Sequence, residues 1–325
     1  MANLNLSADD AADFALLEYL ADGRFHSGSA LGEALSISRA AVWKRISRLI
    51  ELGLAVDSVR GKGYRLASPL DMIVPQRLAD SLPDEATVSY RLVTDSTNSE
   101  AMASHRSGRH WVIAEAQRAG RGRRGRQWQS PLAGNIYCSV RAPMACGVAG
   151  LSGLSLAVGV AVCDALVALY PALPVALKWP NDIWLNDEKL GGILIEVAGE
   201  MEQAAVVVIG IGVNVHLPSD AAAQIDQPWT DLRRHCQEVS RTVLAGTLMA
   251  HVETTLNVFD QDGFAPFQAR FERYDACVGR DVVVSQGKDK KHGVVQGVTQ
   301  SGALRLDCDG KETHLNGGEI SLRLA

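Results

Sequence analysis

Seven residues in the middle of the chain, from Gly120 to Arg126, combine three glycines with four arginines. They include the pattern GxGxxG, which in a dinucleotide-binding fold must open an apolar helix. The residues that follow, Gln127 to Pro131, cannot start such a helix. Glycine lets the backbone approach a ligand closely, and guanidinium groups pair with phosphate or carboxylate oxygens. The run therefore predicts a mobile anion-binding loop with Trp128 placed to stack on an aromatic ring; a basic loop that contacts nucleic acid is the alternative.

Short polar side chains follow an expected strand at 89–93, in the run Asp95-Ser96-Thr97-Asn98. Ser96 and Thr97 offer hydroxyl groups, and Asn98 offers both a donor and an acceptor to a small polar head group. The same run can equally serve as a plain cap for the helix that follows. It becomes a candidate binding segment only in combination with others.

Two lysines flank a hairpin farther along the chain. An expected strand at 174–179 ends in the run Lys178 to Asp182, which presents an amine, an amide and a carboxylate together. After an Asn186-Asp187 turn, the returning strand at 189–196 begins with Lys189. The next strand runs on to Asn214 through Gly210 and Gly212, whose lack of side chains leaves room on one face or else marks a bulge or close packing.

The elements that position these runs begin with a segment divided by charge. Residues 1–35 carry a net charge of −5 and residues 36–68 a net charge of +5. Such a reversal indicates a face turned towards an anionic partner. Helices are expected at 11–21, 27–35 and 39–52, with Ser38 capping the third and Val42, Ile46 and Leu49 facing inward. A hairpin at 55–66 carries basic residues at its tip.

Three helices followed by a hairpin make a winged helix-turn-helix. In that geometry the third helix enters a major groove, and the hairpin tip reaches backbone phosphate. A solvated basic helix in a protein–protein module is the alternative. The candidate DNA-binding residues are Arg39, Lys44, Arg45, Arg48, Arg60 and Lys62.

The remaining chain predicts two further parts. A linker at 68–70 and a small helix at 75–81 precede a mixed α/β block from about Val88 to Phe271. Between 142 and 177 the only charged residue is Asp164, and two prolines interrupt the run, so a buried helix at 151–170 is expected rather than a membrane span. Strands expected at 282–284, 293–299, 303–307, 312–315 and 320–322 predict a small barrel.

Composition places the 325-residue chain, with 47% hydrophobic and 21% charged residues, in the globular class with two or three domains. The net charge of −5 shows no bulk basicity, so nucleic-acid contact must come from a local patch. Six scattered cysteines without a CxxC pair predict free thiols in a reducing cytoplasm. The N-terminal segment shows no signal-peptide pattern, and we expect a cytoplasmic protein without a membrane partner.

Taken together, the motifs resemble biotin–protein ligases in order and spacing. The resemblance rests on Asp95–Asn98, on Glu115–Ala119 running into Gly120–Trp128, and on 178–182, 189–196 and 210–214. Residues 11–68 resemble the DNA-binding domain of the two-function members, the biotin operon repressors, and the tail with Gly317–Ser321 resembles their SH3-like cap. The resemblance implies an α+β multidomain protein: a winged helix-turn-helix at 1–68, a class II synthetase-like mixed α/β catalytic domain at 69–274, and an SH3-like β-barrel at 275–325.

The resemblance also implies a role for individual residues. Arg123, Lys178 and Lys189 would be catalytic, and Asp182 would help to hold Mg²⁺. Trp128, Asn181 and Asn214 would lie on the nucleotide side. The residues implied to contact biotin are Ser96, Thr97, Asn98, Gln117, Arg121, Gly122, Arg123 and Lys189.

The implied reaction joins biotin to the α-phosphate of ATP and then transfers it to a lysine of the biotin carboxyl carrier protein domain. The implied partners are that carrier, operator DNA and a second copy of the chain in a ligand-promoted homodimer. A lipoate–protein ligase is one alternative, although the arginine-rich loop and the winged helix favour biotin. A biotin-sensing repressor without ligase activity, and a ligase whose first domain no longer binds DNA, are the others.

Overall fold

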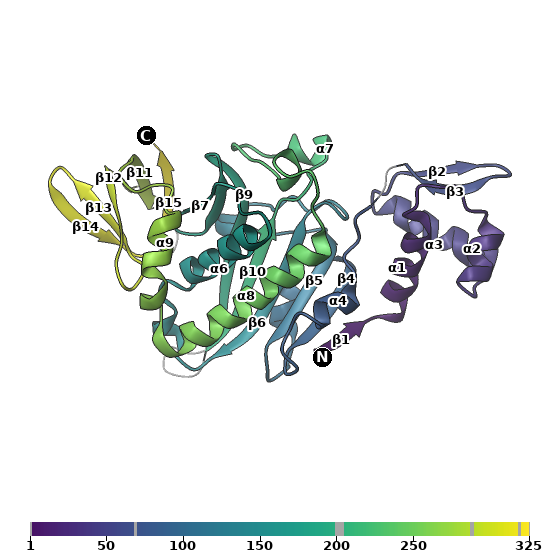
Figure 1. Ribbon diagram of the computed structural model, residues 1–325, viewed down its shortest axis with the longest axis horizontal. Coiled ribbons are helices and arrows are strands. Elements are labelled where there is room, and N and C mark those ends of the chain that lie inside the picture. Colours follow the sequence, from purple (N-terminus) through teal and green to yellow (C-terminus); the bar gives the residue numbers. More distant parts are fainter. Residues whose placement is uncertain (1, 68–69, 199–204, 287–288, 318–319, 325) are drawn as a thin grey trace.

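The computed structural model describes residues 2–67, 70–198, 205–286, 289–317 and 320–324. Three parts follow one another along the long axis of the molecule, with the helical N-terminal part at one end and the C-terminal sheet at the other (Figure 1). The expected linker residues Ser68 and Pro69, and Gly318 and Glu319 of the C-terminal motif, lie outside the described residues. None of the described helices is long and apolar enough to cross a lipid bilayer.

The N-terminal part is a winged helix-turn-helix, as the sequence predicted. Its helices each begin after a serine whose hydroxyl accepts a hydrogen bond from the first turn: Ser7, Ser27 and Ser38. The three inward positions expected on the third helix are buried. The elements are α1 (Ala8–Leu20), α2 (Gly28–Ala34), α3 (Arg39–Glu51), β2 (Val56–Val59) and β3 (Gly63–Leu66).

The central part is built on an eight-stranded sheet with the order β1-β4-β5-β6-β10-β9-β8-β7. Pairing is parallel from β1 to β5 and antiparallel from β5 to β7. The strands are β1 (Asn3–Leu6), β4 (Thr87–Thr94), β5 (His110–Gln117), β6 (Ile136–Met144), β7 (Val175–Lys178), β8 (Asp182–Leu185), β9 (Glu188–Ala198) and β10 (Ala205–Val213).

Strand β1 corrects the grouping of residues 1–68 into a single domain. Residues Asn3–Leu6 pair with Thr87–Tyr90 and so belong to the central sheet rather than to the winged helix. The alternating Asn and Leu side chains of β1 fit a half-buried strand, but so short a run does not show which sheet it joins. Its pairing depends on the free edge that β4 offers, which is a non-local feature.

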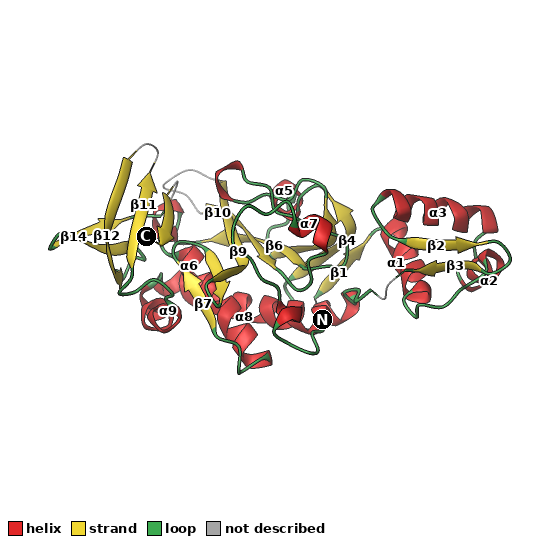
Figure 2. Cartoon of the chain, turned by 90° about the horizontal axis from the view of Figure 1, so that it is seen from above, coloured by secondary structure: helices red, strands yellow, loops and turns green. Residues whose placement is uncertain are grey.

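Helices cover both faces of the sheet (Figures 1 and 2). Helix α6 (Leu154–Leu169) is largely buried, which confirms the buried helix expected at 151–170, and it packs with α4 (Pro75–Ala79) and α8 (Arg241–Asp262) over one face. Helix α5 (Thr97–Ala103) lies on the other face, where Ala101 packs against Val112 and Val208. Short helices occur at α7 (Ser219–Ala222), α9 (Gln268–Tyr274), Arg123–Gly125, Val148–Leu151, Leu232–Arg234 and Ala265–Phe267.

The C-terminal part is an antiparallel five-stranded sheet with the order β14-β13-β12-β11-β15. Each of the five strands expected from the sequence is present: β11 (Asp281–Gln286), β12 (Asp289–Val298), β13 (Leu304–Cys308), β14 (Lys311–Leu315) and β15 (Ile320–Leu324). The Trp179 indole donates a hydrogen bond to Gly302 O at 3.1 Å, so this sheet is anchored directly beside the 178–182 run.

The winged helix is docked on the central sheet rather than merely tethered. The Leu92 backbone N–H donates to Asp10 Oδ1 at 3.2 Å, and the rings of Phe14 and Tyr90 meet edge to face with centroids 5.7 Å apart. Leu92 and Ala133 of the central part share one apolar cluster with the winged-helix core. The orientation of the N-terminal part is thus set by packing.

Candidate functional site

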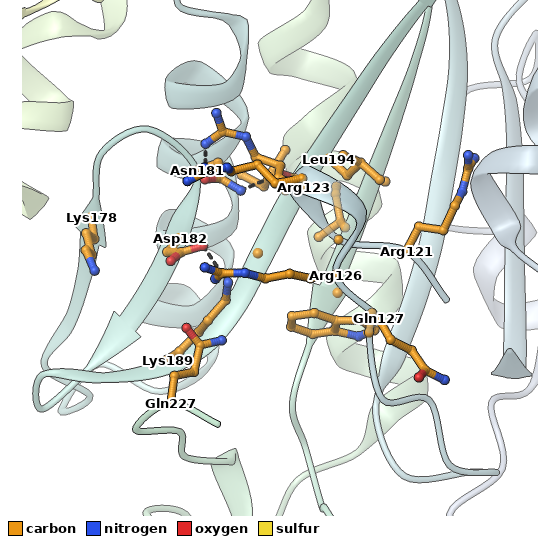
Figure 3. A pocket seen from close by; sticks show the side chains of 18 of the residues that line it. Arg121, Arg123, Arg126, Gln127, Lys178, Asn181, Asp182, Lys189, Leu194 and Gln227 are labelled. Carbon is orange, nitrogen blue, oxygen red and sulfur yellow. Dashed lines mark hydrogen bonds and ion pairs between the residues drawn. The ribbon is translucent and has the colours of Figure 1, made fainter. Parts of the chain in front are cut away.

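A cavity of about 520 Å³ lies over the middle strands of the central sheet. Val208, Gly210 and Gly212 alternate along β10 and therefore face the same side, which is the face that carries α5. The polar runs singled out in the sequence converge on this cavity from the loops and strands that carry them (Figure 3). Its lining includes Ser96, Thr97, Asn98, Gln117, Arg121, Gly122, Arg123, Arg126, Trp128, Lys178, Asn181, Asp182, Lys189, Gly192, Gly210, Gly212, Gln227 and Arg323.

The arginine-rich segment forms a short hairpin above the cavity. Gly122 N–H donates to Arg126 O at 2.7 Å, and Trp128 N–H donates to Gly120 O at 2.9 Å. Arg124 and Gly125 at its tip both adopt positive φ, 59° and 71°, a conformation that glycine accepts without strain. The hydrogen bonds at its base fix where the loop starts and ends, and the side chains of Arg121, Arg123 and Arg126 extend from it in different directions (Figure 3).

Two of these arginines contact strand ends across the cavity. Arg123 donates to Asn181 Oδ1 at 2.7 Å, and Arg121 pairs with Glu196 at 2.8 Å. Burial lowers the pKa of Arg123 from its ordinary value, although it stays charged at any ordinary pH. The third, Arg126, extends towards Asp182 and Lys189 (Figure 3). A dense positive charge therefore faces a cavity with few counter-charges, as an anion site requires.

The two lysines that flank the hairpin do not point to the same place. Lys189 Nζ pairs with Asp182 Oδ1 at 2.6 Å and lies 5.7 Å from the centroid of the Trp128 ring. Lys178 stands apart, with Nζ 4.5 Å from the centroid of the Trp184 ring (Figure 3). Burial lowers the pKa of Lys178. Lys189 is therefore central to the site, whereas Lys178 occupies its rim.

A chain of short polar side chains closes the far end of the cavity. Gln117 Oε1 accepts from both the N–H and the hydroxyl of Thr97, at 2.9 and 3.1 Å. Ser139 Oγ lies 2.7 Å from Thr97 Oγ1 and 2.6 Å from Asn98 Oδ1, and Asn98 Nδ2 donates to Glu196 at 2.8 Å. Each partner fixes the rotamer of the next, so this end is a preorganised set of donors and acceptors.

Two glycines of β10 make this arrangement possible. A Cβ at Gly210 would lie 2.2 Å from Asn98 Oδ1, and one at Gly212 would lie 2.6 Å from the Trp128 indole. The sequence left these glycines open between a binding face and plain packing. The structure shows that they let Asn98 and Trp128 lie directly on the strand.

Asn214 is the remaining residue expected on the nucleotide side. It is not among the described residues that line the cavity. Its amide donates to Thr230 O at 3.0 Å and to Lys189 O at 3.5 Å, while its N–H donates to Leu190 O. Asn214 thus joins the 228–230 segment to the strand that carries Lys189, and it reinforces the backbone hydrogen bond that Thr230 N–H donates to Lys189 O at 3.0 Å.

Several lining residues were missed by sequence reasoning. Arg126 had a signal as the fourth arginine of the loop. Gln227 lies in a long connection and had none. Ser139 is not a lining residue but hydrogen-bonds to Thr97 and Asn98, and it had no signal because it lies inside an ordinary strand. Arg323 comes from the C-terminal sheet and reaches the cavity only through domain packing.

A buried ion pair sits behind the site. Arg241 and Glu115 are both fully buried, with Arg241 Nη1 2.6 Å from Glu115 Oε2. Arg241 also donates to the carbonyls of Asp71 and Asn135, and Glu115 Oε1 accepts from Ile73 N–H at 2.8 Å. Because each charge is both paired and hydrogen-bonded, the pair holds the segment after the winged helix against the central sheet.

The candidate DNA-binding residues separate into two groups. Arg45 and Arg48 both pair with Asp13, a fully buried carboxylate of α1, at 2.6 and 3.2 Å. Their charge therefore stabilises the helical packing, which limits the expectation that they contact DNA. Arg39, Lys44, Arg60 and Lys62 are exposed and form no ion pair within the described part of the chain.

Asp182 is the candidate ligand for Mg²⁺. The described residues contain no group of three or more His, Cys, Asp or Glu side chains that could hold a metal ion by themselves. A single carboxylate fits Mg²⁺, which keeps water ligands and is held largely by substrate phosphates. Asp182 meets that requirement at the point where the arginine loop and Lys189 converge.

Sequence comparison finds relatives for every part of the chain. A sequence model of the biotin/lipoate A/B protein ligase family matches residues 90–214, one for a helix-turn-helix domain matches 13–65, and one for the biotin protein ligase C-terminal domain matches 278–323. The bifunctional ligase/repressor BirA of Escherichia coli (strain K12) is 39% identical over 98% of this chain and 99% of its own length.

Other relatives and solved structures agree. The biotin–[acetyl-CoA-carboxylase] ligase of Paracoccus denitrificans is 36% identical and matches 66% of this chain and 91% of its own length. The structure of the biotin protein ligase from Aquifex aeolicus in complex with biotin and ATP superposes with a TM-score of 0.62 at 25% identity, covering 73% of this chain and 99% of that one.

Proposed function

The chain belongs to the family of bifunctional biotin ligase/repressors, and we propose that the cavity over β10 forms biotinyl-5′-AMP from biotin and ATP, with release of pyrophosphate. The enzyme then transfers biotin to a lysine of a biotin carboxyl carrier protein domain, and AMP leaves. Its winged helix binds operator DNA and represses transcription. The observation that carries the assignment of the site is the convergence of Arg123, Lys189 and the Thr97–Gln117 network on one cavity.

The polar end of the cavity suits the ureido group of biotin. That group presents one carbonyl acceptor and two N–H donors, and the network of Ser96, Thr97, Asn98, Gln117 and Ser139 offers both kinds of partner. Gly210 and Gly212 let Asn98 and Trp128 lie against the strand, where they border the place that we assign to the bicyclic ring. The biotin carboxylate then points towards the arginine loop and Lys189.

Charge is the main obstacle to the first step, because a carboxylate must attack a phosphate. Arg123 and Lys189 offset that repulsion and stabilise the charge that develops at the α-phosphorus. Asp182 orients Lys189 and would hold Mg²⁺, which when bound withdraws charge from the phosphates. Trp128 and Asn181 shelter the nucleotide, and Lys178 adds a positive field from the rim. The arginine loop excludes water from the mixed anhydride.

The remaining parts serve the two partners. We assign the five-stranded C-terminal sheet as an SH3-like cap whose Arg323 borders the cavity where the acceptor lysine must enter. We also propose that the adenylate promotes a homodimer, since a dimer binds paired half-sites in DNA and a ligand that favours the dimer raises operator occupancy.

The test is ATP-dependent transfer of labelled biotin to a carrier domain, run beside labelled lipoate. We expect biotin-dependent and ATP-dependent labelling with biotin only. Labelling with lipoate and not with biotin would show that lipoate is the substrate. Tight biotin binding without labelling by either acid would leave a biotin-sensing repressor that is not a ligase.

A further inference from the structure

An aromatic ring stands in solvent on the helix expected to enter the DNA groove. Trp43 has 61% of its surface exposed, more than any other large apolar side chain among the described residues. It takes no part in the core of the winged helix, because Val42, Ile46 and Leu49 fill the buried side of α3. A tryptophan gains most when it buries its large surface against a partner, so an exposed one on this helix calls for an occupant.

Trp43 lies in the N-terminal half of α3, the part of a recognition helix that contacts base edges. Helix α3 begins at Arg39, and Ala40, Trp43 and Lys44 are exposed as well. Ala40 precedes Trp43 by three residues and Lys44 by four, so their side chains are neighbours on one helix face. The outward face of the first two turns is therefore apolar at its centre, with a cation on either side.

The charges around this face favour a polyanion as the occupant. Arg39 and Lys44 on α3, and Arg60 and Lys62 at the β2–β3 tip, are exposed and without an ion pair in the described residues. Arg45 and Arg48 are instead held by Asp13. The helix and the hairpin tip thus present unpaired positive charge on both sides of Trp43. The apolar group that a DNA major groove displays is the C5-methyl of thymine.

We propose that Trp43, with Ala40 beside it, reads thymine methyl groups in the major groove of the operator. Arg39, Lys44 and the hairpin tip then hold the backbone on either side. This inference rests on the proposed repressor function and adds to it a base preference. Trp43 is accordingly a specificity-determining residue, whereas the cations supply affinity that depends little on sequence.

The experiment starts from the full-length protein with biotin and ATP, used to enrich its preferred site from a pool of random duplexes. Each thymine of the enriched half-site is then replaced in turn by deoxyuridine, which removes only the methyl group. We expect one or two replacements to weaken wild-type binding about three- to tenfold. Trp43→Ala should weaken binding to the unmodified site about tenfold, within the range of one base-pair contact.

The decisive measurement combines the Trp43→Ala substitution with the deoxyuridine replacements. If Trp43 touches the methyl group, the same deoxyuridine replacements should have no further effect on Trp43→Ala, because the two groups form one interaction. Ile50→Ala is the matched control, since Ile50 is also exposed on α3 but lies in its last turn. It should keep the affinity and the deoxyuridine response of the wild type. Both variants should retain biotin transfer, which shows that they fold.

Three outcomes would overturn the inference. If Trp43→Ala keeps the wild-type affinity and the wild-type response to deoxyuridine, Trp43 does not read bases, although the protein still acts as a repressor. If Trp43→Ala instead loses the same affinity for the thymine site and for the deoxyuridine-substituted site, the variant still responds to loss of the methyl group. Another residue would then make the methyl contact. If the wild-type protein enriches no sequence from the pool, the proposed repressor function fails and this inference fails with it.

Discussion

At the scale of single residues, the site depends on which charges have partners and which face the substrate. Arg123 reaches Asn181 from the loop, and Lys189 is held by Asp182, so both cations are positioned before any substrate arrives. Preorganised charge of this kind stabilises a transition state without a reorganisation penalty. The exposed Arg118, only 3.8 Å from the likewise exposed Asp95, plays no such part.

Arg123→Ala should therefore impair adenylation while leaving the fold intact. We expect kcat/KM for biotin transfer to fall about 100-fold, as for the loss of one transition-state donor. More of the adenylate should also escape, because the loop loses its contact with Asn181. Radiolabelled ATP, with free and bound biotinyl-5′-AMP separated by filtration, measures both effects. Arg118→Ala is the control and should match the wild type; equal losses in the two variants would contradict the assignment.

His110 gives a prediction for stability against pH. Burial, together with the charges of Arg106 and Arg91, lowers its pKa to about 4 from 6.5. Its ring nitrogens lie 2.7 Å from Thr87 Oγ1 and 3.2 Å from Ser89 Oγ. Since the folded pKa is depressed, the unfolded chain binds the proton first as pH falls below 6.5. The stabilisation present above that pH is thus lost between pH 6.5 and about 4.

The loss should reach about 2 kcal/mol at pH 5 relative to pH 7.5. Urea unfolding at the two pH values measures it in the wild type and in His110→Asn, which cannot titrate. The free energy of unfolding should fall by about 2 kcal/mol more in the wild type than in the variant. An equal fall in both proteins would show that other groups carry the pH dependence.

At the scale of elements, strand β10 has two glycines on the face that borders the cavity. Gly210 and Gly212 alternate on the face that carries the cavity, so Asn98 and Trp128 approach the strand backbone more closely than any Cβ would permit. The β8–β9 hairpin is equally local in origin, because Asn186 and Asp187 both adopt positive φ and close it tightly. Lys189 lies on the returning strand of that hairpin, where its side chain forms an ion pair with Asp182.

Gly210→Ala should weaken the binding of biotin without unfolding the protein. The new methyl group would displace Asn98 and break its contacts with Ser139 and Glu196. We expect a roughly tenfold weaker affinity for biotin, as for a lost buried hydrogen bond. Isothermal titration calorimetry with biotin measures it. Gly108→Ala is the control, since its Cβ would meet nothing closer than 3.8 Å. Unchanged affinity in Gly210→Ala would remove Asn98 from the site.

At the scale of the whole molecule, the winged helix has two attachments to the ligase sheet. Strand β1 pairs with β4 before the winged helix begins, and the buried Arg241–Glu115 pair holds the chain after it ends. Asp10 and Phe14 add contacts between the two attachments. Strand β4 leads directly into the 95–98 run, so the orientation of the DNA-binding part is built onto the same strand as the biotin end of the cavity.

Deletion of residues 2–6 should loosen that orientation. We expect faster amide exchange in β4 at 87–90, which loses its edge partner, and operator affinity weaker by about three- to tenfold. Biotin transfer should stay within twofold of the wild type. Hydrogen exchange and DNA binding measure these effects. The control is a double variant, Asn3→Ala with Asn5→Ala, because both side chains point to solvent. Unchanged exchange in the deletion would show that β1 contributes nothing to docking.

The sequence by itself determined whatever depends on neighbouring residues. The Ser38 cap and a 3.6-residue period predicted the helices of the winged helix-turn-helix, and the Asn186-Asp187 turn predicted the β8–β9 hairpin. The arginine–glycine loop and the two lysine runs also stood out locally, because unusual densities of charge and glycine need no tertiary context to be recognised. These signals identified most of the residues that line the cavity.

Only the tertiary structure decided which partner each side chain meets. Asn214 joins two backbones behind the cavity, Arg45 and Arg48 turn to a buried Asp13, and Ser139 completes the polar end from within an ordinary strand. Strand β1 joins a sheet whose edge is formed more than eighty residues later. In each case the deciding contact is made between segments far apart in the chain, and periodicity, capping and turn chemistry carry no information about such contacts.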